Sequence, residues 1–211
     1  MKKLISLLLA AVMCFSLVAC GAESSGSTPV EEIKAPSIAE YAIGEAFGTD
    51  SVECVVTEAR WVTLEDVTSH PEATDVIGTD YQTCQRLLTE DMFPGYSFYG
   101  ISGFSSKATG YPYFAVTFTL QNVGKEIVKP VVQGYEFVSY GSIAVVYDDG
   151  YTFEAKEGFN STLEILGDAF KEGRVFELPS QVSENEDKPL KVKITLPASN
   201  GEAEAFIVNI R

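Results

Sequence analysis

The chain has 211 residues, and its 30 Asp and Glu outnumber its 15 Lys and Arg, which gives a formal net charge of −15 at pH 7. This charge argues against a nucleic-acid partner, because phosphate binding needs a basic surface. Direct binding to anionic lipid headgroups is disfavoured for the same reason. The charge mainly indicates solubility, with cationic partners as a further option.

The first residues have the pattern of a bacterial lipoprotein signal peptide. Lys2 and Lys3 precede an apolar run from Leu4 to Ala19, whose length is that of a signal peptide rather than of a membrane span. Its end, LVACG, resembles the lipobox, in which a diacylglycerol is joined to the cysteine and the chain is cut before it. We therefore predict a signal peptide over 1–19, a lipidated Cys20, and a location on the outer face of the cytoplasmic membrane.

Residues 20–40 are predicted to be a flexible tether, and 41–211 a single folded domain. The tether is rich in Ser, Gly, Glu and Pro, so it cannot bury enough apolar surface to offset its ordering entropy. Removing the two signal-peptide lysines leaves 13 Lys and Arg against 30 Asp and Glu, a charge of −17. The domain has no second apolar run of membrane-spanning length.

Alternating apolar residues and turn signals predict a series of short strands in the domain. The predicted strands are 44–50, 52–61, 113–120, 127–132, 136–140, 143–147, 151–153, 173–179, 190–196 and 205–210. Gly124 is expected to adopt a left-handed conformation in a turn. Pro130 predicts an edge position for its strand, and Asp149-Gly150 predicts a type I′ hairpin.

The region from Trp61 to Gly110 lacks this pattern of short alternating strands separated by turns. A short helix is predicted over Asp80–Asp91, with Thr79 as its N-cap, and a weaker helical pattern covers Leu163–Phe170. After the first helix comes an aromatic, glycine-rich segment, which either covers one end of the core or forms a recognition surface for a peptide or sugar. The candidate recognition residues are Phe93, Tyr96, Phe98, Tyr99 and Phe104.

Two cysteines, Cys54 and Cys84, remain once Cys14 leaves with the signal peptide and Cys20 is lipidated. An exported protein permits a disulfide between them. The alternative is that Cys54 packs as a small apolar residue in a strand and Cys84 packs one side of the helix. Because they form no CxxC pair and His70 is the one histidine, a Cys/His zinc site is not expected.

The strands and turns together predict an all-β fold, an immunoglobulin-like antiparallel β-sandwich with one short helix in a long inserted connection. Three segments resemble a telokin-like, immunoglobulin-like domain of unknown function found in Gram-positive lipoproteins: Tyr113–Glu126 (YFAVTFTLQNVGKE), the hairpin Val146–Phe153, and Gly173–Pro179. The resemblance covers roughly 41–211. It departs in the long Trp61–Gly110 region and in having Glu172-Gly173 where the family has Pro-Gly. It implies a cell-envelope binding module, and it supplies no catalytic residue.

Residue patterns typical of catalysis are not found. His70 precedes Pro71 in a polar loop and is expected to be solvated, and Asp148-Asp149 is interpreted as a turn rather than a calcium site. We therefore predict no enzyme activity, no cofactor and no metal.

The function that these patterns favour is a lipid-anchored, non-enzymatic interaction module whose partner is an unknown protein, peptide or glycan. The alternatives are a solute-capture lipoprotein, a protease-inhibitor-like sandwich, and a hydrolase using paired carboxylates. The lack of βαβ periodicity argues against solute capture. Two buried carboxylates facing each other across a deep cleft would favour the hydrolase.

Overall fold

The computed structural model describes residues 38–62, 87–99 and 113–211, which all belong to one compact unit, Ile38–Arg211. Cys20, Cys84, Phe104, His70, the predicted signal peptide and most of the predicted helix lie outside these residues. Within them, no helix is long and apolar enough to cross a membrane.

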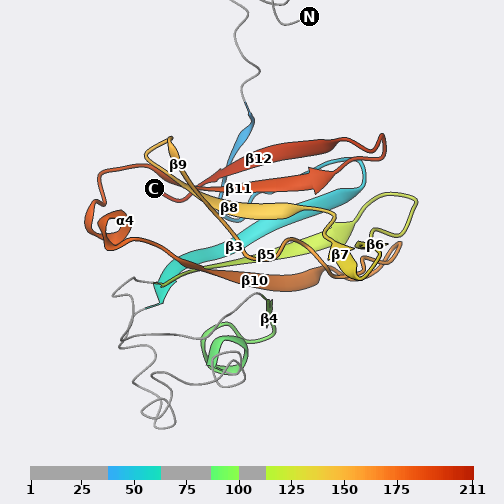
Figure 1. Ribbon diagram of the computed structural model, residues 1–211, viewed down its shortest axis with the longest axis horizontal. Coiled ribbons are helices and arrows are strands. Elements are labelled where there is room, and N and C mark those ends of the chain that lie inside the picture. Colours follow the sequence, from blue (N-terminus) through green and yellow to red (C-terminus); the bar gives the residue numbers. More distant parts are fainter. Residues whose placement is uncertain (1–37, 63–86, 100–112) are drawn as a thin grey trace, which may run out of the picture. The chain divides into compact units, whose positions relative to one another are not determined.

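Two five-stranded sheets pack against each other, and a separate two-stranded sheet lies at one end of them (Figure 1). In spatial order, the first sheet contains β1 (Glu40–Ala42), β12 (Ala203–Asn209), β11 (Leu190–Pro197), β8 (Ser142–Tyr147) and β9 (Tyr151–Glu154). The second contains β2 (Ala46–Gly48), β3 (Val52–Val62), β5 (Tyr113–Asn122), β10 (Phe170–Glu177) and β4 (Ser97–Phe98). The third pairs β6 (Val131–Gln133) with β7 (Glu136–Val138). The predicted all-β sandwich is confirmed.

The pairing is antiparallel in the interior of both large sheets and parallel at one edge of each. β1 runs parallel to β12, and β4 runs parallel to β10. The sequence did not predict β1, because it lies at the border of the predicted tether. It also did not predict the helix α4 (Ser180–Glu184), which is too short to give a periodic signal.

The main core lies between the two sheets and follows from alternation along the strands. In β11, the side chains of Leu190, Val192, Ile194 and Leu196 are buried and the residues between them are half-buried. Each such side chain contributes about 1.5–3 kcal/mol when it is fully buried. β5 is buried on both faces from Phe114 to Phe118, because a second, smaller apolar cluster covers its outer face.

The β8–β9 hairpin forms where it was predicted, with its left-handed residues shifted by one position. Asp148 and Asp149 have φ values of 50° and 51°, and the N–H of Gly150 donates to the carbonyl of Tyr147 at 3.2 Å. Both central residues therefore have the positive φ of a type I′ turn. The prediction placed this conformation at Asp149-Gly150. The short side chain of aspartate tolerates a left-handed backbone conformation. Gly150 is therefore not needed at either central position of the turn.

Gly124 is required for close packing rather than for a left-handed conformation, which corrects the prediction. A Cβ atom at Gly124 would lie 3.1 Å from the Cα of Ser51 and 3.4 Å from the carbonyl oxygen of Asp50. The N–H of Gly124 donates to the side-chain oxygen of Asn122 at 2.9 Å. The glycine thus lets the turn after β5 approach the turn before β3.

The helical segments differ from the predictions. In the described part of 80–91, the chain forms a π-helix, η2 (Leu87–Met92). The predicted helix over Leu163–Phe170 is wrong: Leu163 forms an isolated bridge with Val128, and Leu166 has a φ of 57°. Leu166 is 94% exposed, so no apolar helical face packs here.

Candidate interaction surface at one end of the sandwich

The aromatic segment after η2 is largely part of the second core. Phe93 and Phe98 are buried, with ring centroids 5.3 Å apart, in a cluster with Val62, Leu88 and Ala115. This finding removes Phe93 and Phe98 from the predicted recognition surface, because neither side chain reaches solvent. An alanine substitution of Phe98 would open a cavity in the fold rather than probe a contact.

Tyr96 and Tyr99 are half-buried and have structural contacts of their own. The Tyr96 hydroxyl donates to Thr57 at 2.9 Å, and the Thr57 and Thr117 hydroxyls lie 2.9 Å apart. The Arg174 guanidinium lies 5.3 Å from the Tyr99 ring centroid. A recognition role for these two tyrosines stays a prediction.

Exposed apolar side chains gather instead on two segments, 123–138 and 163–166, which we call the apolar end. Eight of the eleven large apolar side chains that are exposed in the described part of the chain belong to them. They are Val123, Ile127, Val131, Val132, Tyr135, Val138, Ile165 and Leu166. Tyr135 is fully exposed. Large exposed apolar side chains that are concentrated on a few segments of a soluble protein commonly mark contact surfaces.

The hairpin β6–β7 carries half of these side chains. Its two-residue turn, Gly134-Tyr135, has positive φ only at Gly134 (66°), as a type II′ turn requires. Each residue of β6 is exposed, including the valines that point to its two opposite faces. Figure 1 shows the hairpin at the end of the sandwich where β5 ends and β10 begins. The sequence predicted strands here, but it gave no sign that they form a separate sheet.

Asn122 joins the two segments of the apolar end. Its buried amide nitrogen donates to the carbonyls of Glu126, at 2.7 Å, and Leu163, at 2.9 Å. Val128 and Leu163 then exchange two backbone hydrogen bonds, at 3.2 and 2.8 Å. The segment before β6 and the loop that carries Leu166 are therefore held side by side.

A buried ion pair on β10 anchors the start of that loop. A nitrogen of Arg174 lies 2.9 Å from an oxygen of Glu172, and both side chains are almost completely buried. Arg174 also donates to the carbonyls of Gly158 (2.7 Å), Gly173 (2.9 Å) and Glu157 (3.3 Å), while the Ser161 hydroxyl donates to Glu172. The predictions missed this pair. The sequence feature that could have revealed the pair is the alternation along the strand, which puts Glu172 and Arg174 on the same core-facing side as Phe176.

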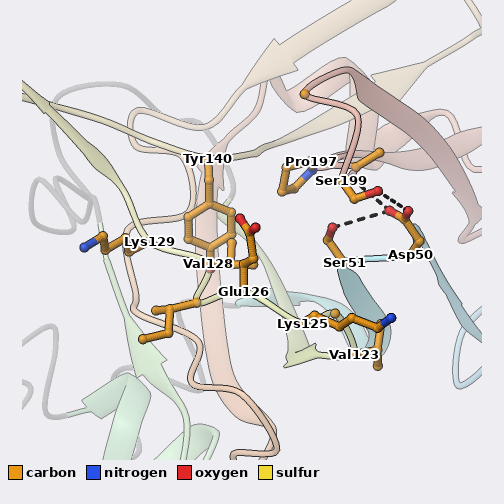
Figure 2. Close-up of a pocket in the computed structure, with 14 residues that line it drawn as sticks. Asp50, Ser51, Val123, Lys125, Glu126, Val128, Lys129, Tyr140, Pro197 and Ser199 are labelled. Atoms are coloured by element: carbon orange, nitrogen blue, oxygen red, sulfur yellow. Dashed lines mark hydrogen bonds between the residues drawn. The ribbon is translucent and has the colours of Figure 1, made fainter.

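A pocket of about 610 Å³ lies beside the apolar end (Figure 2). It is bordered by the turn before β3, the segment 123–129, Tyr140 and the β11–β12 turn. Figure 2 shows the Tyr140 ring beside Glu126 and Val128, with the Asp50–Ser199 contact at the other side of the pocket. Lys125 and Lys129 also line it, so the pocket presents charges of both signs.

The two carboxylates of this pocket, Asp50 and Glu126, are exposed. Asp50 accepts hydrogen bonds from the Ser199 N–H, at 2.8 Å, and from the Ser199 hydroxyl. These bonds lower the pKa of Asp50 below its usual value of 3.8. A general acid needs a raised pKa, which Asp50 lacks. Both carboxylates are also exposed, whereas a hydrolase of the predicted kind would need buried ones. Among the described residues, no group of three or more potential metal ligands occurs.

Burial has strong effects on two titratable groups, Tyr140 and Cys54. The Tyr140 hydroxyl oxygen is buried without a hydrogen-bond partner in the described structure, and burial, with a smaller contribution from Glu172, raises its pKa. Cys54 is a buried free thiol within the described residues, and burial raises its pKa well above the usual value. Its predicted disulfide partner, Cys84, lies outside them. The Tyr140 ring lines the pocket, but its hydroxyl oxygen is buried, and Cys54 is buried completely, so neither contributes a reactive atom to the surface.

Comparisons with known proteins give one structural similarity. No protein-family model matches the chain, and no curated protein matches it. The chain is similar to the crystal structure of an uncharacterized beta-sandwich protein from Clostridium difficile 630, at 13% sequence identity and a TM-score of 0.43. The alignment covers 90% of this chain and 100% of the other.

Proposed function

We propose that the protein is a lipid-anchored, non-enzymatic interaction module of the cell envelope that binds a protein partner through the apolar end. The observation that carries this proposal is the concentration of eight of the eleven exposed large apolar side chains, among the described residues, on two joined segments. Water is displaced from this surface only when another surface covers it, and that displacement favours association.

The chemistry of the apolar end favours a protein partner over a small solute. Its large apolar side chains are exposed, and burying several of them at once needs a partner with a large complementary surface rather than a small molecule. Tyr135 offers the kind of aromatic anchor that often dominates the energy of protein interfaces. The neighbouring pocket, with Lys125 and Glu126, can accept polar side chains at the rim of such an interface.

The hydrogen bonds and ion pairs of two carboxylates, Glu172 and Asp50, support the proposal that the protein is not an enzyme. Glu172 is already bound by Arg174 and Ser161 and is closed to solvent, and Asp50 is held in its charged form by Ser199. Neither is placed to donate a proton to a substrate.

The proposed cellular location of the module is inferred from the sequence alone. The lysines, the apolar run and the lipobox-like LVACG come in the order of a lipoprotein precursor. The proposal therefore includes lipidation of Cys20, a location on the outer face of the cytoplasmic membrane, and a telokin-like, immunoglobulin-like type of sandwich. Incorporation of an alkyne-tagged fatty acid in a bacterial host should label the wild-type chain and fail to label Cys20→Ala.

Site-specific photocrosslinking tests the contact surface directly. A benzophenone amino acid at Tyr135 should give crosslinked adducts in intact cells. The same group at Tyr151, which is 63% exposed on the edge strand β9, serves as the matched control. Adducts at position 135 that are absent at position 151 support the proposal. Equal adducts at both positions, or none at position 135, would overturn it.

A further inference from the structure

We propose that the partner of the apolar end is a second copy of this chain, and that the two copies pair through the outer edges of their β6 strands. This inference rests on the proposed function, since it names the occupant of the same surface. It starts from the direction of the backbone groups of β6. It then uses the register of the hairpin and the charges beside it.

The free edge of β6 is defined by its pairing with β7. Gln133 pairs with Glu136 across the two-residue turn, so these two residues exchange hydrogen bonds. Pairs alternate along an antiparallel ladder, and the next pair, Val132 with Phe137, is a non-hydrogen-bonded one. The N–H and C=O of Val132 therefore point away from β7. Within the described chain, residues 131–138 make no backbone hydrogen bond outside this hairpin.

A two-fold axis beside Val132 satisfies these groups. Two β6 strands side by side in antiparallel orientation place Val132 of each copy opposite Val132 of the other, where they exchange two hydrogen bonds. The result is a four-stranded sheet, in which exposed valines of the two copies become cross-strand neighbours. Pro130, which has no N–H, limits the ladder to the centre of the contact.

The charges beside β6 are self-complementary in this arrangement. Because the two β6 strands are antiparallel, the residues just before β6 in one copy lie at the end of the pair where the other copy carries its turn. Lys129 thus meets the turn that carries Tyr135 and Glu136, all three being exposed in the single chain. This places a cation beside an aromatic ring and a carboxylate twice in each dimer. The net charge of −17 that remains without Lys2 and Lys3 opposes association, but it is largely screened beyond about 8 Å at physiological salt.

Sedimentation of the chain from residue 20 onward, carrying Cys20→Ser, tests the inference. We expect a concentration-dependent monomer–dimer equilibrium. Val132→Pro removes the outward N–H and keeps the bonds to β7, so it should abolish the dimer. Val123→Pro is no suitable control, because the N–H of Val123 donates to Ser51 within the chain. The matched control is therefore Tyr151→Ser, at an exposed site on β9, which should dimerise like the wild type.

A charge exchange keeps the test valid if Val132→Pro fails to fold. Lys129→Glu and Glu136→Lys should each weaken the dimer by about fivefold or more, because each puts like charges together twice. The double variant should return to within about threefold of the wild type, as expected for interacting pairs.

Each result of the sedimentation and crosslinking experiments either supports or refutes the proposed dimer. A wild-type chain that stays monomeric overturns the inference, and so does a dimer that is indifferent to both kinds of variant. The proposed function is judged separately, by photocrosslinking at Tyr135. Adducts of twice the mass of the chain support both proposals. Adducts of any other mass leave the proposed function standing and refute pairing with a second copy.

Discussion

Arg174→Met tests how the buried ion pair supports the apolar end. Methionine fills similar space and keeps the apolar contact with the rings of Phe118 and Phe159, whose centroids lie 5.7 and 5.9 Å from the guanidinium. It removes the charge that faces Glu172 and the donors to three backbone carbonyls. An unpaired buried charge costs about 3–5 kcal/mol, a large part of the 5–15 kcal/mol typical of a domain.

Glu172→Gln is the informative partner of that variant. Glutamine keeps the shape and still accepts the Ser161 hydrogen bond, and Arg174 keeps its three carbonyl partners. The expected loss is therefore smaller, about 1–3 kcal/mol. The double variant should cost about 1–3 kcal/mol less than the sum of the two single variants, because it leaves no unpaired charge.

Urea unfolding at pH 7 measures all three losses. The single tryptophan, Trp61, is half-buried and lies 5.0 Å from Phe114, so its fluorescence reports on the core. Circular dichroism supplies an independent probe of two-state behaviour. A loss below about 1 kcal/mol for Arg174→Met, or a loss equal to that of Glu172→Gln, would refute the reasoning that charge pairing holds this loop.

Three further predictions concern other parts of the fold. Ser199→Ala should lower the melting temperature at pH 7. Because the pKa of Asp50 is lowered in the folded state, this difference should fade as the pH falls below the usual value of 3.8, and a constant difference would contradict it. Gly173→Ala should cost about 1–3 kcal/mol in urea unfolding, since its Cβ would lie 2.4 Å from the Phe98 ring; an unchanged midpoint would contradict this. Cys54 should react with iodoacetamide at least about a hundredfold more slowly in the native chain than in urea, as followed by peptide mass spectrometry, and similar rates would show that the thiol is accessible.

The alternating strands could be read directly from the sequence. β5 and β11 were predicted to within two residues, because one face of each strand is apolar at every second position. The β8–β9 hairpin was also predicted, although the choice of Asp148 and Asp149 as left-handed residues was not. Local patterns of this kind depend on neighbours in sequence, which are visible without a structure.

The apolar end and the buried pair depend on neighbours in space, and the sequence could not reveal them. Val131 and Val132 have the composition of a buried strand, yet no part of the described chain covers them. Phe98 lies in a glycine-rich, aromatic segment typical of an exposed loop, yet β4 joins β10 and buries it. In each case, exposure is decided by which distant segment packs there.

The first strand has a mechanical consequence. β1 contains three residues and pairs with β12 alone, helped by contacts of Glu40 with Lys191 and Asn209. Any tension between the chain before Ile38 and a partner held elsewhere on the domain must pass through this short parallel ladder. We therefore expect β1, which is otherwise held mainly by the packing of Tyr41, to detach before the longer strands when the chain is pulled from this end. Its release would add a few residues of extended chain before the sandwich while β2–β12 stay paired, so β1 would limit the force that reaches the rest of the domain.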